Sequence, residues 1–321
     1  MNLGKPFAIA IIAAWTLNTA YAADPYPVKP IRMIVGFPPG GGTDLTARPV
    51  AQKMSELLGQ QVIVENRPGA AGNIATEQVA RAAPDGYTLL MGTIAALAIN
   101  PSLYGNLRFD PETDLAPVIQ VVDSTNVLAL HPSVPASSVR ELIALAKEKS
   151  LSAGSSGVGA TGHLAIEFFN LMAGVKLVHV PYKGGAPAMS DLVGGQVHLV
   201  FATTASAIPH VKSGRIKGIA VTTAKRSALL PELPTISEAG LAGFDANNWY
   251  GLVVPAKTPR AIIDQLNAEV TKILNMPDVR TALFNQGLDP APGTPEQFGA
   301  YIRAERSKWA RVIKESGAKA E

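Results

Sequence analysis

A glycine-rich junction between a strand pattern and a helix pattern occurs twice in this chain, with about a third of the chain between the two copies. In the first copy the apolar run Ile31–Val35 leads into a glycine cluster, Gly40-Gly41-Gly42-Thr43-Asp44, before a helical pattern. In the second copy the segment 151–162 precedes a helical pattern that begins at His163. Glycine lets backbone N–H groups turn toward a ligand, and a helix N-terminus adds unpaired N–H groups at the positive end of its dipole. Each junction is therefore predicted to bind an anion, and the pair indicates two lobes that close on one small anion.

The length and composition agree with two globular lobes. A chain of 321 residues predicts about two domains, because a single core stops growing near about 250–300 residues. Hydrophobic residues make up 47% and charged residues 17%, which is typical of a packed protein rather than a disordered one. The net charge is only +3 and no run of lysine and arginine occurs, so we expect no nucleic-acid partner.

Residues 1–22 have the pattern of a secretory signal peptide. Lys5 supplies a positive charge, residues 7–17 are apolar, and Ala20-Tyr21-Ala22 matches an A-x-A cleavage site. The apolar run is shorter than the roughly 20 residues that span a bilayer. The chain has no cysteine, which excludes a lipid anchor at the cleavage site, disulfides and thiolate metal ligands. We therefore expect an exported, soluble, periplasmic protein that is not a lipoprotein.

Strand and helix patterns alternate along the chain, which predicts an α/β fold with mainly parallel sheets. The second lobe is predicted to span 124–226, and the first to consist of 23–123 and 227–321. Two long helical patterns close the chain, with predicted N-caps at Thr258 and Thr294, and Gln297 completes a capping box with Thr294. If these helices return to the first lobe, the chain crosses the hinge twice.

Other anion-binding and catalytic motifs are incomplete. The stretch 157–162 matches G-x-G-x-x-G, but the strand after it contains no acidic residue to bind a ribose, as a dinucleotide site requires. Neither glycine cluster continues into Gly-Lys-Ser/Thr, and 154–158 lacks the final glycine of G-x-S-x-G. The five histidines show no H-x-x-x-H spacing, although His163 opens the helix behind the second cluster. We expect no metal, no cofactor and no catalytic residues.

With these motifs excluded, the glycine-rich loops are expected to bind an anion through helix dipoles and hydroxyl groups. Neither loop carries a lysine or arginine, which favours a carboxylate over a phosphate. Ser155, Ser156 and Thr161 supply hydroxyl groups, and Phe37 an apolar wall. Asp44 has two interpretations, as a cap of the first helix or as a residue that faces the pocket. Arg48 follows four residues later and is placed to pair with Asp44.

Several motifs together resemble the Bug family, the substrate-binding proteins of tripartite tricarboxylate transporters. The resemblance covers essentially the whole chain after residue 22 and rests on the first glycine cluster with Ala47-Arg48, and on Val64-Glu65-Asn66-Arg67-Pro68-Gly69, Pro84-Asp85-Gly86-Tyr87-Thr88-Leu89, Val180-Pro181-Tyr182-Lys183-Gly184, Pro209-His210-Val211-Lys212-Ser213-Gly214 and Pro234-Thr235-Ile236-Ser237-Glu238-Ala239-Gly240. One departure is His198, where many members have an acidic residue.

The resemblance implies a periplasmic binding protein fold, with two lobes that are joined by two hinge crossings and close on a small carboxylate. A di- or tricarboxylate, an acidic amino acid or an aromatic acid would be held between the loops 37–44 and 155–161. The residues expected to bind it are Phe37, Gly40, Gly41, Asp44, Thr93, Ser155, Ser156, Gly159, Thr161 and Phe201. The expected protein is a monomer that docks transiently on membrane permease subunits. A receptor that serves a sensor, and a secreted enzyme that uses the same cleft, are the alternatives.

Overall fold

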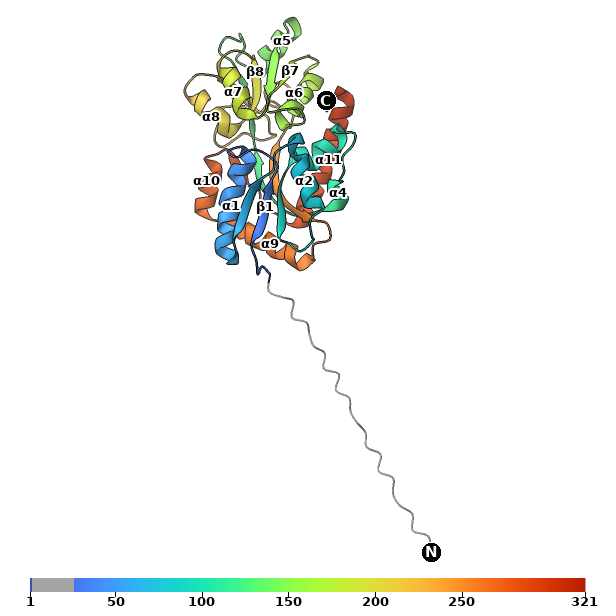
Figure 1. Ribbon diagram of the computed structural model, residues 1–321. Helices are drawn as coiled ribbons and strands as arrows, with labels where there is room; N and C mark the ends of the chain where they lie inside the picture. The colour runs from blue at the N-terminus through green and yellow to red at the C-terminus, as the bar shows by residue number, and fades with distance from the viewer. Residues whose placement is uncertain (2–25, 321) are drawn as a thin grey trace.

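The chain forms two lobes stacked end to end, each built around one β-sheet (Figure 1). This computed structural model describes Met1 and residues 26–320. Apart from Met1, the predicted signal peptide lies outside the described residues. Within the described residues, none of the helices combines the length and apolarity needed to cross a bilayer.

The first lobe contains a six-stranded sheet in the order β11-β4-β10-β3-β1-β2. Its strands are β1 (Ile31–Val35), β2 (Val62–Asn66), β3 (Thr88–Thr93), β4 (Leu115–Ser124), β10 (Asn248–Pro255) and β11 (Leu288–Pro290). Its helices are α1 (Gly42–Leu58), α2 (Asn73–Ala80), α3 (Asn100–Leu103), α4 (Pro111–Asp114), α9 (Arg260–Leu274), α10 (Pro277–Phe284) and α11 (Pro295–Ser316), with two short helical segments, η1 (Ala70–Gly72) and η2 (Ala95–Ile99).

The second lobe contains a five-stranded sheet in the order β7-β6-β8-β5-β9. Its strands are β5 (Asn126–Leu130), β6 (Ser152–Ser155), β7 (Val178–Pro181), β8 (Leu199–Thr203) and β9 (Lys217–Val221). Its helices are α5 (Val139–Glu148), α6 (Thr161–Ala173), α7 (Gly185–Val193) and α8 (Thr204–Lys212). The predicted two-lobe α/β fold is confirmed.

Both sheets are mixed, which corrects the expectation of mainly parallel sheets. Strand β1 is parallel to β2 and β3, but β10 is antiparallel to β3 and β4. Likewise β6 is parallel to β7 and β8, whereas β5 is antiparallel to β8 and β9. The reason is the chain crossing: β5 and β10 enter their sheets from the other lobe, so they start at the edge where the parallel strands end.

Two crossings join the lobes. Strand β4 ends at Ser124 and β5 begins at Asn126, so the first crossing is a single residue long. The second crossing leads into Asn248, the first residue of β10. Beyond residue 226, Thr235 still forms a β-bridge with Val221 of the second sheet. The lobe limits at 124 and 226 remain predictions.

Helix α11 lies against both lobes, and its end reaches α6 of the second lobe (Figure 1). The Trp309 ring packs edge-on to Phe168 of α6 at 6.1 Å between ring centres. The predicted capping box of α11 is confirmed, because Thr294 and Gln297 exchange both bonds. The predicted Thr258 cap of α9 is wrong: its hydroxyl donates to the Pro255 carbonyl at 2.8 Å, and the helix begins two residues later.

Candidate functional site

A cavity of about 460 Å³ lies between the lobes, at the edge where the parallel strands of both sheets end. Its wall in the first lobe includes the loop from Phe37 to Thr43, together with Thr93. The second lobe contributes Ser156, the start of α6 and the start of α8. Ligand sites of α/β proteins occupy this position because the loops after parallel strands gather there.

The structure brings most of the predicted binding residues to this one cavity. Seven of them line it: Phe37, Gly40, Gly41, Thr93, Ser156, Thr161 and Phe201. The other three, Asp44, Ser155 and Gly159, are not among the lining residues. His198 is not among them either; it is exposed and its ring nitrogen accepts a hydrogen bond from the Ser152 N–H at 3.0 Å.

Four helices begin at the cavity wall. Their N-cap residues are Gly41 of α1, Ala160 of α6, Gly184 of α7 and Thr203 of α8, and all four line the cavity. Among the described residues, no side chain caps any of these helices. Uncapped N-termini leave N–H groups free and direct the positive end of the helix dipole toward the cavity.

The first loop is held from behind by Asp44, which is 2% exposed. Its carboxylate accepts hydrogen bonds from the Gly40 N–H at 3.0 Å, from Arg48 at 2.8 and 2.9 Å, and from Asn66 at 2.9 Å. Burial opposes ionisation of Asp44, but these bonds outweigh it and keep its pKa below the usual range. Asp44 therefore holds the loop in place. Both interpretations from the sequence are wrong, because the N-cap of α1 is Gly41 without a side-chain cap and Asp44 does not line the cavity, whereas the predicted pair with Arg48 is confirmed.

A second restraint on this loop comes from the hinge. The hydroxyl group of Tyr250, the third residue of β10, accepts a hydrogen bond from Asn248 at 3.1 Å. A Cβ atom on Gly42 would lie 2.6 Å from the Tyr250 hydroxyl oxygen. The start of α1 therefore requires glycine at position 42, because the backbone approaches the tyrosine closely.

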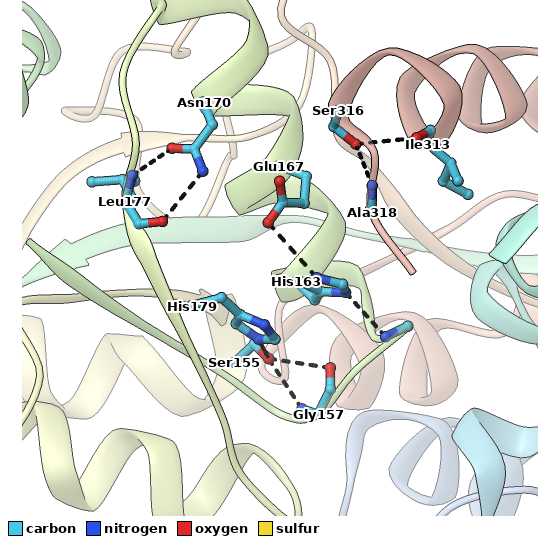
Figure 2. A network of polar contacts seen from close by, with 11 residues as sticks. Ser155, Gly157, His163, Glu167, Asn170, Leu177, His179, Ile313, Ser316 and Ala318 are labelled. Carbon is cyan, nitrogen blue, oxygen red and sulfur yellow. Dashed lines mark hydrogen bonds and ion pairs between the residues drawn. The ribbon is translucent and has the colours of Figure 1, made fainter. Parts of the chain in front are cut away.

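The second loop is held by a network of serine, histidine and backbone groups (Figure 2). The Ser155 hydroxyl lies 2.6 Å from His179 Nε2 and accepts from the Gly157 N–H at 3.1 Å. The Gly159 N–H donates to His163 Nδ1 at 3.1 Å. Gly157 and Gly159 have φ values of 135° and 78°, which favour glycine. Ser155 and Gly159 therefore position the loop from behind the cavity wall.

The two histidines of this network stack on each other. Their ring centres are 4.1 Å apart and the planes differ by 18°. Burial lowers the pKa of both to about 4, and for His163 the neighbouring His179 adds to the effect. Both rings are consequently neutral at neutral pH, as an acceptor role for His163 Nδ1 requires. Glu167 lies 3.8 Å from His163 Nε2, and burial raises its pKa.

The cavity carries almost no side-chain charge. Among the described lining residues, Lys183 is the only charged one, and it is exposed. Lys183 belongs to one of the family motifs, but the sequence did not predict that it lines the cavity. Sequence reasoning also missed the cavity-lining amides, Asn126, Asn248 and Gln286. No sequence motif identifies these amides as cavity residues. They lie at the cavity because of the hinge crossings and the order of the strands.

A two-lobe α/β protein with helix N-termini around an interlobe cavity has the architecture of a solute-binding receptor. Residues 46–318 match the model of the tripartite tricarboxylate transporter family receptor. The chain belongs to this family of solute-binding proteins.

Named relatives agree with this assignment. Protein BugT of Bordetella pertussis is 37% identical over 99% of this chain and 99% of its own length. The solved structure described as R. palustris Rpa4515 with adipate has a TM-score of 0.86 at 38% identity, covering 92% of this chain and 99% of that one. MatC from Rhodopseudomonas palustris, solved with bound malate, has a TM-score of 0.82 at 31% identity, covering 90% and 100%.

Proposed function

We propose that this protein is a periplasmic receptor that captures a small carboxylate between its lobes and delivers it to a tripartite tricarboxylate-type permease. The observation that carries the proposal is the convergence of four uncapped helix N-termini on one cavity whose described wall contains no acidic side chain. Such N-termini favour anions. Solved relatives bound to adipate and to malate support a carboxylate in particular.

The expected affinity follows from the number of bonds that the loops can offer. A hydrogen bond to a charged group contributes roughly 1.5–3 kcal/mol. Three or four such bonds, less the losses from ordering and desolvation, correspond to a dissociation constant of about 1 μM, or about −8 kcal/mol. No side-chain cation in either glycine-rich loop is needed for this value.

Within the proposed site, each glycine-rich loop binds the ligand carboxylate from its own lobe. Gly40 and Gly41 supply the start of α1, and Ser156 and Thr161 supply the start of α6. Phe37 and Phe201 form apolar walls, and Thr93 also lines the cavity. Asp44, Ser155 and Gly159 act on the ligand only through the loops that they position.

A thermal-shift screen of carboxylates on the protein purified from the periplasm tests the proposal. A ligand at 100 times its dissociation constant stabilises the fold by about 2.7 kcal/mol, which is easily measured. Amines and neutral sugars of similar size serve as controls. If these controls shift the melting temperature and carboxylates do not, the proposal is wrong.

Two further measurements separate the alternatives. Recovery of unchanged ligand after prolonged incubation supports a receptor, whereas turnover would indicate a secreted enzyme. Loss of carboxylate uptake after deletion of the gene supports delivery to a permease. Unchanged uptake with a lost transcriptional response would indicate a receptor for a sensor.

A further inference from the structure

The hinge end of the cavity contains an asparagine whose side chain is buried and unpaired. Asn126 lines the cavity and is 1% exposed. Both backbone polar groups of Asn126 have hydrogen-bond partners. Its N–H donates to the Thr222 hydroxyl at 3.2 Å, and its carbonyl accepts from the Thr222 N–H at 2.9 Å. Within the described part of the chain, neither side-chain atom, Nδ2 nor Oδ1, has a hydrogen-bond partner. Buried polar groups are normally satisfied, so this amide indicates a bound partner.

A second unpaired amide oxygen lies at the same end. Gln286 also lines the cavity, and its Oε1 has no partner among residues 26–320. Its neighbour Gly287 packs so closely on α8 that a Cβ atom there would lie 2.5 Å from Thr204 Cβ. The Thr204 N–H in turn donates to the carbonyl of Thr125, the residue before Asn126, at 3.0 Å. These contacts place Gln286 and Asn126 at one end of the cavity.

The order of the strands separates this end from the second glycine-rich loop. In the sheet order β7-β6-β8-β5, the loop that leads to α6 follows β6, and Asn126 begins β5 two strands away. Adjacent strands lie about 4.8 Å apart, so the two positions differ by about 10 Å. Lys183, which follows β7, is one strand further from Asn126. A ligand whose carboxylate binds at the start of α6 therefore presents its other end to the amides.

We propose that the other end of the ligand carries a neutral group that both donates and accepts a hydrogen bond, a hydroxyl or a carboxamide, and that Asn126 and Gln286 bind it. An asparagine side chain presents one acceptor and one donor group in either orientation of its amide. A second carboxylate only accepts, so it leaves the oxygens of both amides unpaired and repels them. An ammonium group only donates, so it leaves the asparagine N–H groups unpaired. This inference rests on the proposed carboxylate receptor and names the class of its ligand.

At this end of the cavity, helix α8 favours a different ligand group from the one that the amides favour. Its positive N-terminus favours a second carboxylate, but its first N–H is bonded to Thr125, and the Thr203 hydroxyl lies 3.0 Å from that of Ser206. Among the described residues, the two amides add three unpaired side-chain atoms at this end, and two of these are acceptors. The balance favours a ligand that donates.

Isothermal titration with matched acids tests the proposal on the protein purified from the periplasm. The six-carbon series is hexanoate, adipate, 6-aminohexanoate, 6-hydroxyhexanoate and adipamate. The four-carbon series is butanoate, succinate, 4-aminobutanoate, 4-hydroxybutanoate and succinamate. In at least one series, we expect the hydroxy acid or the amide acid to bind about 10- to 100-fold more tightly than the other members, because only it pairs the buried amides. Whichever of the two binds more tightly distinguishes a hydroxyl from a carboxamide ligand.

Three variants assign the preference to the amides. Asn126→Leu keeps the side-chain volume and should remove the preference for the hydroxy acid or the amide acid. Gln286→Leu should reduce the preference in part, and Asn285→Leu, at an exposed neighbour outside the cavity wall, should leave it intact. If Asn126→Leu does not fold, the wild-type ranking and the Gln286→Leu variant decide.

The outcomes separate the two proposals. Equal or tighter binding of the dicarboxylate, the amino acid or the unsubstituted acid in both series overturns the inference and leaves the carboxylate receptor standing. A preference that survives both amide variants overturns it as well. Failure of every carboxylate to bind overturns the proposed function itself.

Discussion

The two glycine-rich loops present the same feature to the cavity, a helix N-terminus, but they are supported by different chemistry. Behind the first loop lies an ionised aspartate with an arginine and an asparagine around it. Behind the second lie a serine and two stacked neutral histidines (Figure 2). The comparison shows that similar sequence motifs specify the binding surface, whereas the residues that hold each loop differ in charge and in their response to pH.

The largest expected difference between the loops is their response to acid. The pKa of His163 and His179 is about 4 in the folded protein against 6.5 for an ordinary histidine, so the unfolded chain takes up protons first. Their contribution to stability is complete above pH 6.5 and is lost as pH falls toward 4, by roughly 2–4 kcal/mol. Urea unfolding between pH 7 and pH 4 measures this loss.

The variant His179→Gln separates this effect from general acid unfolding. It should be less stable than wild type at neutral pH and should show a flatter dependence on pH between 6.5 and 4. The depressed pKa of Asp44 means that the first loop loses its contribution only at lower pH, as protons reach its carboxylate. An unchanged slope in His179→Gln would contradict the assignment of the acid response to the second loop.

The next largest effect should come from the charged support of the first loop. Asp44→Ala leaves Arg48, Asn66 and the Gly40 N–H without their shared acceptor, and we expect a loss of about 2 kcal/mol in the free energy of unfolding together with weaker ligand binding. Asp264→Ala is the matched control, because Asp264 pairs with Arg260 at the same i,i+4 spacing but is exposed. Its stability should stay close to that of wild type. Equal losses in the two variants would show that the buried position of Asp44 does not matter.

A smaller effect is expected at the start of α6. Thr161→Val keeps the shape of the side chain and removes the hydroxyl group that lines the cavity. Loss of one hydrogen bond to a carboxylate should weaken binding at least about 10-fold, with little change in stability. Thr113→Val, at an exposed position away from the cavity, should bind as wild type does. Unchanged affinity in Thr161→Val would remove this hydroxyl from the proposed site.

The smallest effect on binding is expected at Ser155, in the loop before α6. Ser155→Ala removes the partner of His179 Nε2, so it should lower stability by about 1 kcal/mol. Because Ser155 does not line the cavity, ligand affinity should change less than about twofold when measured well below the melting temperature. A loss of affinity as large as that of Thr161→Val would return Ser155 to the ligand-binding residues.

The sequence by itself determined the local features of this protein. Glycine clusters after apolar runs located both loops, because a backbone at positive φ near a helix start depends on the residues at that position. The Thr294 capping box and the Asp44–Arg48 pair were predictable for the same reason, since their partners lie three or four residues apart. The family motifs then predicted that both loops act on one carboxylate.

Only the tertiary structure decided which side chains line the cavity. Ser155 is adjacent to the cavity-lining Ser156 in the sequence, but its partner His179 lies 24 residues away on the neighbouring strand, and that contact turns it inward. Strand direction was also decided by the hinge, because β5 and β10 enter from the opposite lobe. Asn126 and Gln286 line the same cavity only because of this crossing. Contacts between residues far apart in the chain depend on how the lobes pack, and no local pattern encodes that arrangement.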